Sequence, residues 1–131
     1  MGKLSTILDE STISFIRSQA MFFVASAPLD AAGHVNISPK GLDTVRVLDG
    51  GRVAYLDLTG SGIETVAHIK ENGRVELTRV SQSCGFGVPL FKYEGERPQL
   101  EAWAKQKGAD GLKTYRQNKN SSSIDGLRGL R

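Results

Sequence analysis

The sequence predicts a mainly β fold with helices, in the α+β class. Several short segments alternate apolar and polar residues, as half-buried strands do. Clusters of Pro, Gly and Asp separate these segments, which is typical of antiparallel hairpin loops. Segments with helical spacing occur near the start, the middle and the end of the chain. The chain has 131 residues, so we expect a single domain over 1–131.

The first part of the chain is predicted to form a helix followed by antiparallel strands. Apolar residues recur at helical spacing over 4–19. Strands are predicted at 21–27, 34–38, 44–48 and 52–58. The first of these has the continuous apolar character of a buried strand, and Val35 and Ile37 share one face of the second. Loops at 28–33, 39–41 and 49–51 join the strands into a meander, the pattern of a small barrel or sandwich.

The second part of the chain is richer in helix. A helix over 63–70 should end near Asn72, with Gly73 in the left-handed conformation that follows many helices. One more strand is predicted at 74–80, before a Gly-rich loop. Residues 98–118 are predicted to form two helices joined around Gly108 and Gly111. The remaining tail has no periodicity and is expected to lie along a surface.

Composition and charge exclude several classes of function. The net charge is +3, and residues 98–131 carry seven Lys/Arg against three Asp/Glu. These charges are mixed rather than clustered with aromatic residues, so we expect no nucleic-acid partner. No apolar run approaches the roughly 20 residues that span a bilayer, and the start of the chain does not resemble a secretory signal. The lone Cys84 fits a reducing compartment, so a cytoplasmic protein is expected.

The segment 59–65 joins a predicted strand to a predicted helix and is the most informative stretch. The first N–H groups of a helix have no intrahelical partner and attract anions, and the glycines let a phosphate approach the backbone. Thr59 and Ser61 would add hydroxyl groups. The same residues also fit a capping box, with Ser61 at the N-cap and Glu64 three residues later, which needs no ligand.

Several segments together resemble the pyridoxamine 5′-phosphate oxidase-like FMN-binding proteins, in particular a bacterial branch of flavin-nucleotide-binding proteins. The resemblance covers nearly the whole chain and depends on the order and spacing of its motifs. The matching segments are Met21-Phe-Phe-Val-Ala-Ser-Ala-Pro-Leu-Asp, Gly33-His-Val-Asn-Ile-Ser-Pro-Lys-Gly-Leu-Asp43, Arg46-Val-Leu48, Ala54-Tyr-Leu-Asp-Leu-Thr-Gly-Ser-Gly62 with Glu64-Thr65, and Cys84-Gly-Phe-Gly-Val-Pro-Leu90.

This resemblance implies a split β-barrel that forms a homodimer and holds FMN in a groove between subunits. Ser38, Pro39 and Lys40 would lie beside the flavin ring, where Lys40 could donate to the flavin as hydride transfer places negative charge on it. Leu56 and Asp57 would line the same groove. The ribityl chain and phosphate would contact the residues that follow, which are Thr59, Ser61, Gly62, Glu64 and Thr65. No residue is assigned as catalytic or as a metal ligand.

The chain is shorter than the resemblance leads us to expect. Only 75–80 separate the first helix and strand from the Gly-rich loop, where the family would have several further barrel strands. Three explanations remain open: residues of a longer chain that this sequence lacks, a natural deletion, or strand exchange in a dimer. A barrel without these strands would leave sheet edges and an apolar face open to water, and would lose half of the dimer groove.

The leading functional hypothesis is an FMN-dependent oxidoreductase acting on an unidentified small molecule. A flavin-binding module without catalysis and a degenerate fragment that no longer binds FMN are the alternatives. Haem or a deazaflavin in place of FMN is a lesser variant. The phosphate of a pyridoxamine-type substrate would need a basic pocket, for which the Lys and Arg residues of 105–119 are the only candidates, although a solvated helix face explains them better.

Overall fold

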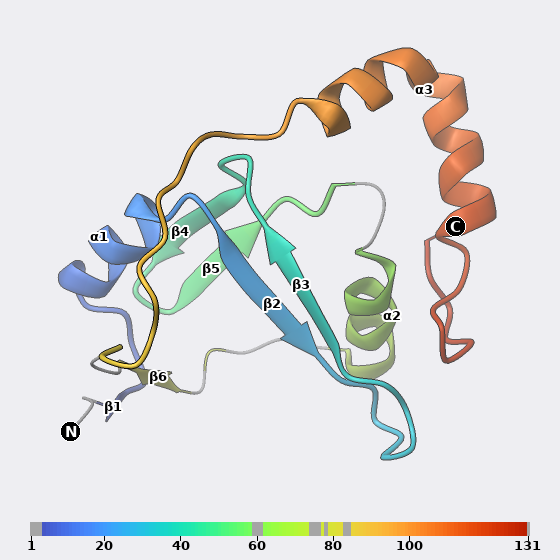
Figure 1. The fold of residues 1–131 in the computed structure, drawn as a ribbon. Helices are drawn as coiled ribbons and strands as arrows, with labels where there is room; N and C mark the ends of the chain where they lie inside the picture. The colour runs from blue at the N-terminus through green and yellow to red at the C-terminus, as the bar shows by residue number, and fades with distance from the viewer. Residues whose placement is uncertain (1–3, 59–61, 74–76, 78, 83–84, 131) are drawn as a thin grey trace. The chain divides into compact units, whose positions relative to one another are not determined.

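The computed structural model describes residues 4–58, 62–73, 77, 79–82 and 85–130 (Figure 1). The elements in chain order are β1 (Leu4–Ser5), α1 (Glu10–Ser18), β2 (Phe22–Ser26), β3 (Asn36–Lys40), β4 (Val45–Asp49), β5 (Arg52–Tyr55), α2 (Ile63–Asn72), β6 (Val80–Ser81) and α3 (Gln99–Lys119). Within the described residues the strands form three two-stranded antiparallel sheets, β1–β6, β2–β3 and β4–β5. The predicted α+β class is therefore confirmed.

The chain divides into two compact units, each assembled from three separate segments. The first unit contains Met1–Met21, Gly41–Leu56 and Glu76–Gly95, and the second contains Phe22–Lys40, Asp57–Val75 and Glu96–Arg131. Neither unit is a contiguous stretch of sequence. A single domain over the whole chain stays a prediction. Among the described helices, none combines the length and the apolar character needed to cross a membrane.

In the first unit, α1 is shorter than the helix predicted over 4–19. Asp9 lies in an extended conformation as the N-cap, and its carboxylate accepts the Thr12 N–H at 2.9 Å. This cap starts the helix at Glu10, while Leu4 and Ser5 pair with β6 instead. The start of the predicted helix was therefore wrong. The Leu8 N–H donates to the Gly50 carbonyl at 2.7 Å and ties this segment to the β4–β5 turn.

The β4–β5 hairpin closes through the predicted turn at 49–51. The Asp49 carboxylate accepts the Gly51 N–H at 2.9 Å and the Arg52 side chain at 2.7 Å. The strand predicted over 52–58 stops at Tyr55. Of the strand predicted at 74–80, residues 74–76 and 78 lie outside the described part, and β6 contains its last residue together with Ser81.

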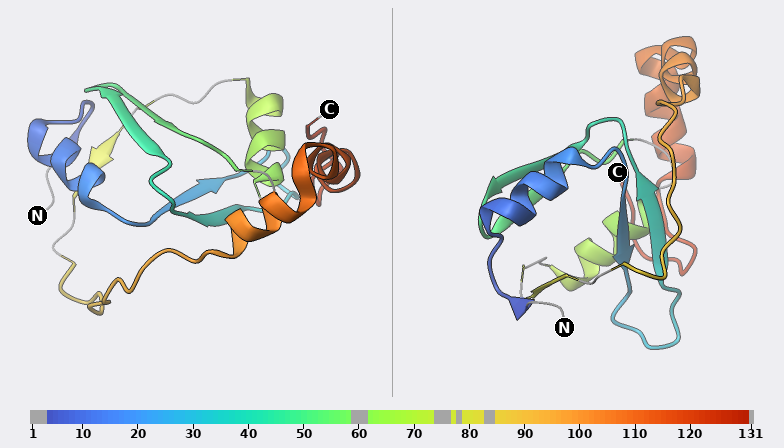
Figure 2. Two further views of the ribbon diagram at one scale, coloured as in Figure 1. Left: turned by 90° about the horizontal axis from the view of Figure 1, so that it is seen from above. Right: turned by 60° about the vertical axis from the view of Figure 1, so that its left-hand side comes forward.

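In the second unit, the inward face of the β2–β3 hairpin combines the polar residues of β3 with Phe22, Val24 and Ser26 of β2. The register pairs Phe22 with Lys40, Val24 with Ser38 and Ser26 with Asn36, and α2 packs against β2 on that side (Figures 1 and 2). The opposite face carries Phe23 and Ile37, whose exposed fractions are 63% and 65%. The prediction that 21–27 is a buried strand was therefore wrong for one of its two faces.

Strand β3 also continues further than expected, through Pro39 and Lys40. Pro39 lies opposite Phe23 in the ladder. Because a two-stranded sheet consists of edge strands only, a proline without an N–H is tolerated there. The turn predicted to begin at Pro39 is therefore displaced along the chain. As a consequence, Ser38 and Lys40 lie on the same face of one strand.

Helix α2 ends as predicted. Gly73 adopts φ 76° and its N–H donates to the Ile69 carbonyl at 2.8 Å. At the other end, the N-cap residue is Gly62, without a side-chain hydrogen bond. Ser61, the N-cap of the expected capping box, lies outside the described residues. The Glu64 carboxylate accepts the backbone N–H of Ile124 at 2.9 Å and so binds the C-terminal tail.

Helix α3 is bent at Gly108, as Figure 1 shows, where φ is 62° and ψ is −179°. This non-helical residue divides the element into the two helices that the sequence predicts. The rings of Trp103 and Tyr115, on either side of the bend, meet edge to face with centroids 5.0 Å apart. Gly111 lies within the second helix and does not interrupt it.

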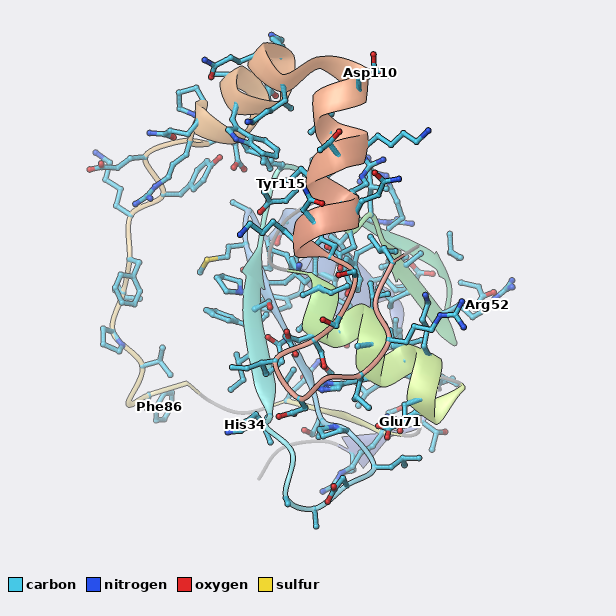
Figure 3. All side chains as sticks on the ribbon, turned by 90° about the vertical axis from the view of Figure 1, so that its right-hand side faces the viewer. His34, Arg52, Glu71, Phe86, Asp110 and Tyr115 are labelled. Atoms are coloured by element: carbon cyan, nitrogen blue, oxygen red, sulfur yellow. The ribbon has the colours of Figure 1, made fainter. Side chains whose placement is uncertain are left out.

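The C-terminal tail folds back on itself and contacts α2 and the β2–β3 loop. Ser122 and Arg128 form an isolated antiparallel bridge. Lys70 donates to the Gly129 carbonyl. Asp125 accepts the His34 N–H at 2.7 Å and binds His34 Nδ1 at 2.6 Å, so that His34 lies beside the tail (Figure 3). The tail was expected to lie along a surface, and these contacts show that the surface is formed by α2 and the β2–β3 loop.

The His34–Asp125 contact makes tail attachment depend on pH. The Asp125 hydrogen bond and charge raise the pKa of His34, and the same contact lowers the pKa of Asp125. The His34 contribution to stability is present below its unfolded pKa of about 6.5 and is lost as pH rises through the higher folded pKa. The Asp125 contribution is lost as pH falls through its lowered folded pKa.

We therefore expect Asp125→Asn to bring the pKa of His34 back toward its ordinary value. An NMR titration of the His34 imidazole in the wild type and the variant measures this. Asp110→Asn, which changes an exposed acid on α3, is the matched control and should leave the His34 titration unchanged. An identical His34 pKa in wild type and Asp125→Asn would contradict the contact.

Candidate functional site

A cluster of polar side chains lies buried between the β2–β3 hairpin and α2. Asn36 Nδ2 donates to Ser38 Oγ at 3.1 Å and to Thr65 Oγ1 at 3.1 Å. Ser38 Oγ also donates to Asn36 Oδ1 at 3.2 Å. Ser38 is 4% exposed and Thr65 is 3% exposed. Both hydroxyl groups are thus engaged within the protein.

His68 is the most deeply buried member of this cluster, with 1% of its surface exposed. Its Nδ1 forms a hydrogen bond of 3.0 Å with Ser26 Oγ. Its Nε2 is buried and has no hydrogen-bond partner among the described residues. A buried polar atom without a partner costs free energy, so the surrounding contacts must hold His68 in place against this cost.

A second polar group lies at the start of α2. Lys40 Nζ donates to Asp57 Oδ1 at 3.2 Å, and their side chains are 12% and 21% exposed. The Asp57 carboxylate packs directly against the Cα of Gly62, where a Cβ would overlap it. Asp57 Oδ2 is buried without a hydrogen-bond partner among the described residues. An ion pair is therefore held at the N-terminal end of a helix, where the helix dipole favours the carboxylate.

A cavity of about 580 Å³ opens beside this ion pair. One part of its wall comes from the start of α2 and the residues before it, and the rest comes from α3 and the tail. The first part consists of Asp57, Leu58, Gly62, Ile63 and Val66. This volume falls within the range of about 300–1,000 Å³ that is usual for small-molecule sites. The wall combines apolar side chains with a few polar groups, which suits a ligand that has both characters.

The residues that the sequence assigned to a cofactor site are thus distributed over several environments. Ser38, Lys40, Asp57, Gly62 and Thr65 lie together in the second unit. Pro39 is exposed, on the face of the hairpin opposite to Ser38. Leu56 belongs to the first unit and is exposed, and its N–H donates to the Thr44 carbonyl at 3.0 Å. Thr59 and Ser61 lie outside the described residues.

Sequence reasoning did not assign Ser26, Asn36 and His68 to this region. The helical spacing of Thr65 and His68 places both on one face of α2. Asn36, Ser38 and Lys40 alternate along β3 and so share a face. These two patterns were visible in the sequence, but neither indicates that both polar faces turn inward and meet. Among the described residues, no group of three or more His, Cys, Asp or Glu side chains could hold a metal ion.

Comparison with known proteins identifies the family. The chain is 31% identical to the pyridoxamine 5′-phosphate oxidase family protein ustO of Aspergillus flavus, in an alignment of 189 positions that covers 94% of this chain and 76% of the relative. The chain belongs to the pyridoxamine 5′-phosphate oxidase family. No family model and no solved structure matches it. The open two-stranded sheets and the C-terminal helix α3 are consistent with an incomplete split barrel of this family.

The same alignment shows that the relative is longer within the shared region. Because 94% of 131 residues is about 123 residues, about 66 of the 189 aligned positions carry no residue of this chain. With about 66 fewer residues than ustO in the aligned region, this chain has fewer residues that could form strands and pair with the strands it has.

The close approach of Asp57 to Gly62 leads to a stability prediction. Gly62 has φ −78° and ψ −3°, which alanine also adopts, so the effect of Gly62→Ala should come from the overlap of its Cβ with Asp57. We expect Gly62→Ala to lower the free energy of unfolding by about 1–3 kcal/mol, the usual cost of overpacking. Urea unfolding followed by circular dichroism measures this.

Gly87→Ala is the matched control, because a Cβ there would meet no atom within 4 Å. The loss should be smaller when Gly62→Ala is made in an Asp57→Ala background, which removes the overlapping carboxylate. Equal losses in both backgrounds would show that the overlap with Asp57 is not the cause.

Proposed function

We propose that the protein binds FMN and acts as a flavin-dependent oxidoreductase on a small molecule. The observation that carries the proposal is its membership of the pyridoxamine 5′-phosphate oxidase family, with 94% of the chain aligned to a member. Bound FMN would accept a hydride from a reductant and pass electrons on to an acceptor. The physiological substrate is not part of the proposal.

The Lys40–Asp57 pair and the adjacent cavity support this proposal. A flavin nucleotide has an apolar ring, a polar chain and a phosphate, and the cavity wall offers matching groups. Lys40 is held by Asp57 at 3.2 Å, so its ammonium group has a fixed position at the end of β3. The proposed role of Lys40 is to orient the flavin and to donate a hydrogen bond to it. Ser38 and Thr65 would support Lys40 and α2 through the buried cluster.

The test is a visible absorption spectrum of purified protein, recorded before and after incubation with FMN and desalting. We expect flavin bands in about stoichiometric amount to remain with the protein after desalting. Haem or a deazaflavin, if bound in place of FMN, would give a different spectrum. Protein that stays colourless after incubation with FMN would refute the proposal.

A second candidate function is flavin binding without catalysis. The observation that favours it is that about 66 positions of the alignment with ustO carry no residue of this chain. If those residues supplied part of a substrate site, FMN could be retained without turnover. Oxidation of reduced nicotinamides by the FMN-loaded protein separates the two candidates, because only an oxidoreductase would exceed free FMN at the same concentration.

The proposal includes a homodimer, supported by the outward face of the β2–β3 hairpin. Phe23 and Ile37 are mostly exposed there, and a two-stranded sheet has unpaired edges, which favours association. A second copy of this chain would remove both from water. The proposal also includes a cytoplasmic location, for which the support is the single cysteine.

We expect the wild type to sediment as a dimer and Phe23→Lys/Ile37→Lys to sediment as a monomer, because buried charge opposes the contact. Sedimentation velocity measures the two masses. Ile124→Lys introduces a charge at another exposed apolar residue of the second unit and should leave the dimer intact. A monomeric wild type would contradict this part of the proposal.

A further inference from the structure

The C-terminal tail, residues 120–130, is a loop whose two ends meet at the cavity of about 580 Å³. The Leu130 N–H donates to the Asn120 carbonyl at 2.6 Å, and the Gly129 N–H donates to the Ser121 carbonyl at 2.9 Å. Asn120 and Leu130 both belong to the cavity wall. Because these hydrogen bonds lie within the tail, the loop can move away from the rest of the protein without losing them.

Helix α3 has little packing of its own to hold it beside α2. None of its residues is buried, and it makes no extensive contact with another described helix or strand. Nevertheless, Lys113 and Gln117 of α3 line the same cavity as Ile63 and Val66 of α2. The tail follows α3 directly and contacts α2, so it links the two walls of the cavity (Figure 3).

Polar contacts hold the tip of the tail in place. Asp125 binds the backbone N–H and the ring of His34 at 2.7 and 2.6 Å. The Ile124 N–H donates to the Glu64 carboxylate at 2.9 Å, while the Ile124 side chain is 75% exposed. The tip therefore buries little apolar surface, and polar contacts near water contribute little free energy each. Such an attachment can be released without unfolding the elements beneath it.

The base of the tail is held more closely. Lys70 donates to the Gly129 carbonyl. Gly129 packs directly against Ile63, so that a Cβ at position 129 would overlap the Ile63 side chain and the Asn120 carbonyl. The absence of a side chain at this position lets the tail approach α2, and the next residue, Leu130, thereby reaches the cavity wall.

We propose that the tail is a clasp that keeps α3 against α2 and must release before a ligand can enter or leave the cavity. Release takes Leu130 out of the cavity wall and frees α3 to move away from Ile63 and Val66. The rate of tail release then limits the rate of ligand exchange. The clasp acts on any ligand of this cavity, so the inference goes beyond the proposed function and does not depend on FMN.

The test measures how readily a small reagent reaches the cavity. Val66→Cys places a thiol in the cavity wall, and a Cys84→Ser background leaves no other thiol. Alkylation of this thiol by iodoacetamide is followed by mass spectrometry. We expect two clasp variants, Asp125→Ala/Lys70→Ala and Gly129→Ala, each to raise the alkylation rate about 10-fold. This is the change in an opening equilibrium typical of losing one hydrogen bond to a charged group.

Ser121→Ala is the matched control, because it changes an exposed side chain of the tail and should leave the alkylation rate unchanged. Val24→Cys in the same Cys84→Ser background places a thiol on the inward face of β2, outside the cavity wall, and reports unfolding of the second unit. Its alkylation rate should be the same with and without the clasp substitutions. An unchanged rate at Val66→Cys in both clasp variants, or an equal increase at Val24→Cys, would overturn the inference.

Discussion

The contact of α2 with the inward face of the β2–β3 hairpin is the constraint on which the rest of the second unit depends. Thr65 and His68 on the helix form hydrogen bonds with Ser26 and Asn36 on the strands. Hydrogen bonds are directional and a buried polar group that loses its partner costs free energy, so these contacts favour one orientation of the helix. That orientation puts Gly62 against Asp57 and makes Asp57 available to Lys40.

The alternation of the sequence predicts the two faces of β3 but not which of them turns inward. Ile37 and Pro39 form one face, and Asn36, Ser38 and Lys40 form the other. Ordinary hydrophobic reasoning buries the first set, whereas the structure buries Ser38 fully and Asn36 and Lys40 in part. The helix α2, its terminating Gly73 and the bend at Gly108 were predicted because local rules govern them. The packing of α2 depends on partners far away in sequence, which no local pattern indicates.

In the candidate site, too, local sequence patterns predict which residues share a face but not which distant residues they contact. Lys40 and Asp57 were expected near each other only because the chain resembles a family, since 17 residues separate them in the sequence. Lys113 and Arg116 belong to the basic residues of 105–119 that the sequence offered for a substrate phosphate, and they line the cavity beside Asp57. Their helical spacing shows that they share a face but not what that face meets. Lysine is usually exposed, yet the side chain of Lys40 is only 12% exposed, which composition does not indicate.

The exposed apolar face of the β2–β3 hairpin and the smaller number of residues in this chain than in ustO can have one physical origin. A split barrel buries one face of its sheet beneath other strands, and about 66 aligned positions of ustO have no counterpart here. If some of those positions form strands, their removal would uncover Phe23 and Ile37 while leaving the face against α2 untouched. The side chains of Ser38 and Lys40, which are proposed above to serve the cofactor site, lie on that inward face. The covering of the apolar face and the binding of FMN are therefore separable properties of this chain, and a loss of one does not entail a loss of the other.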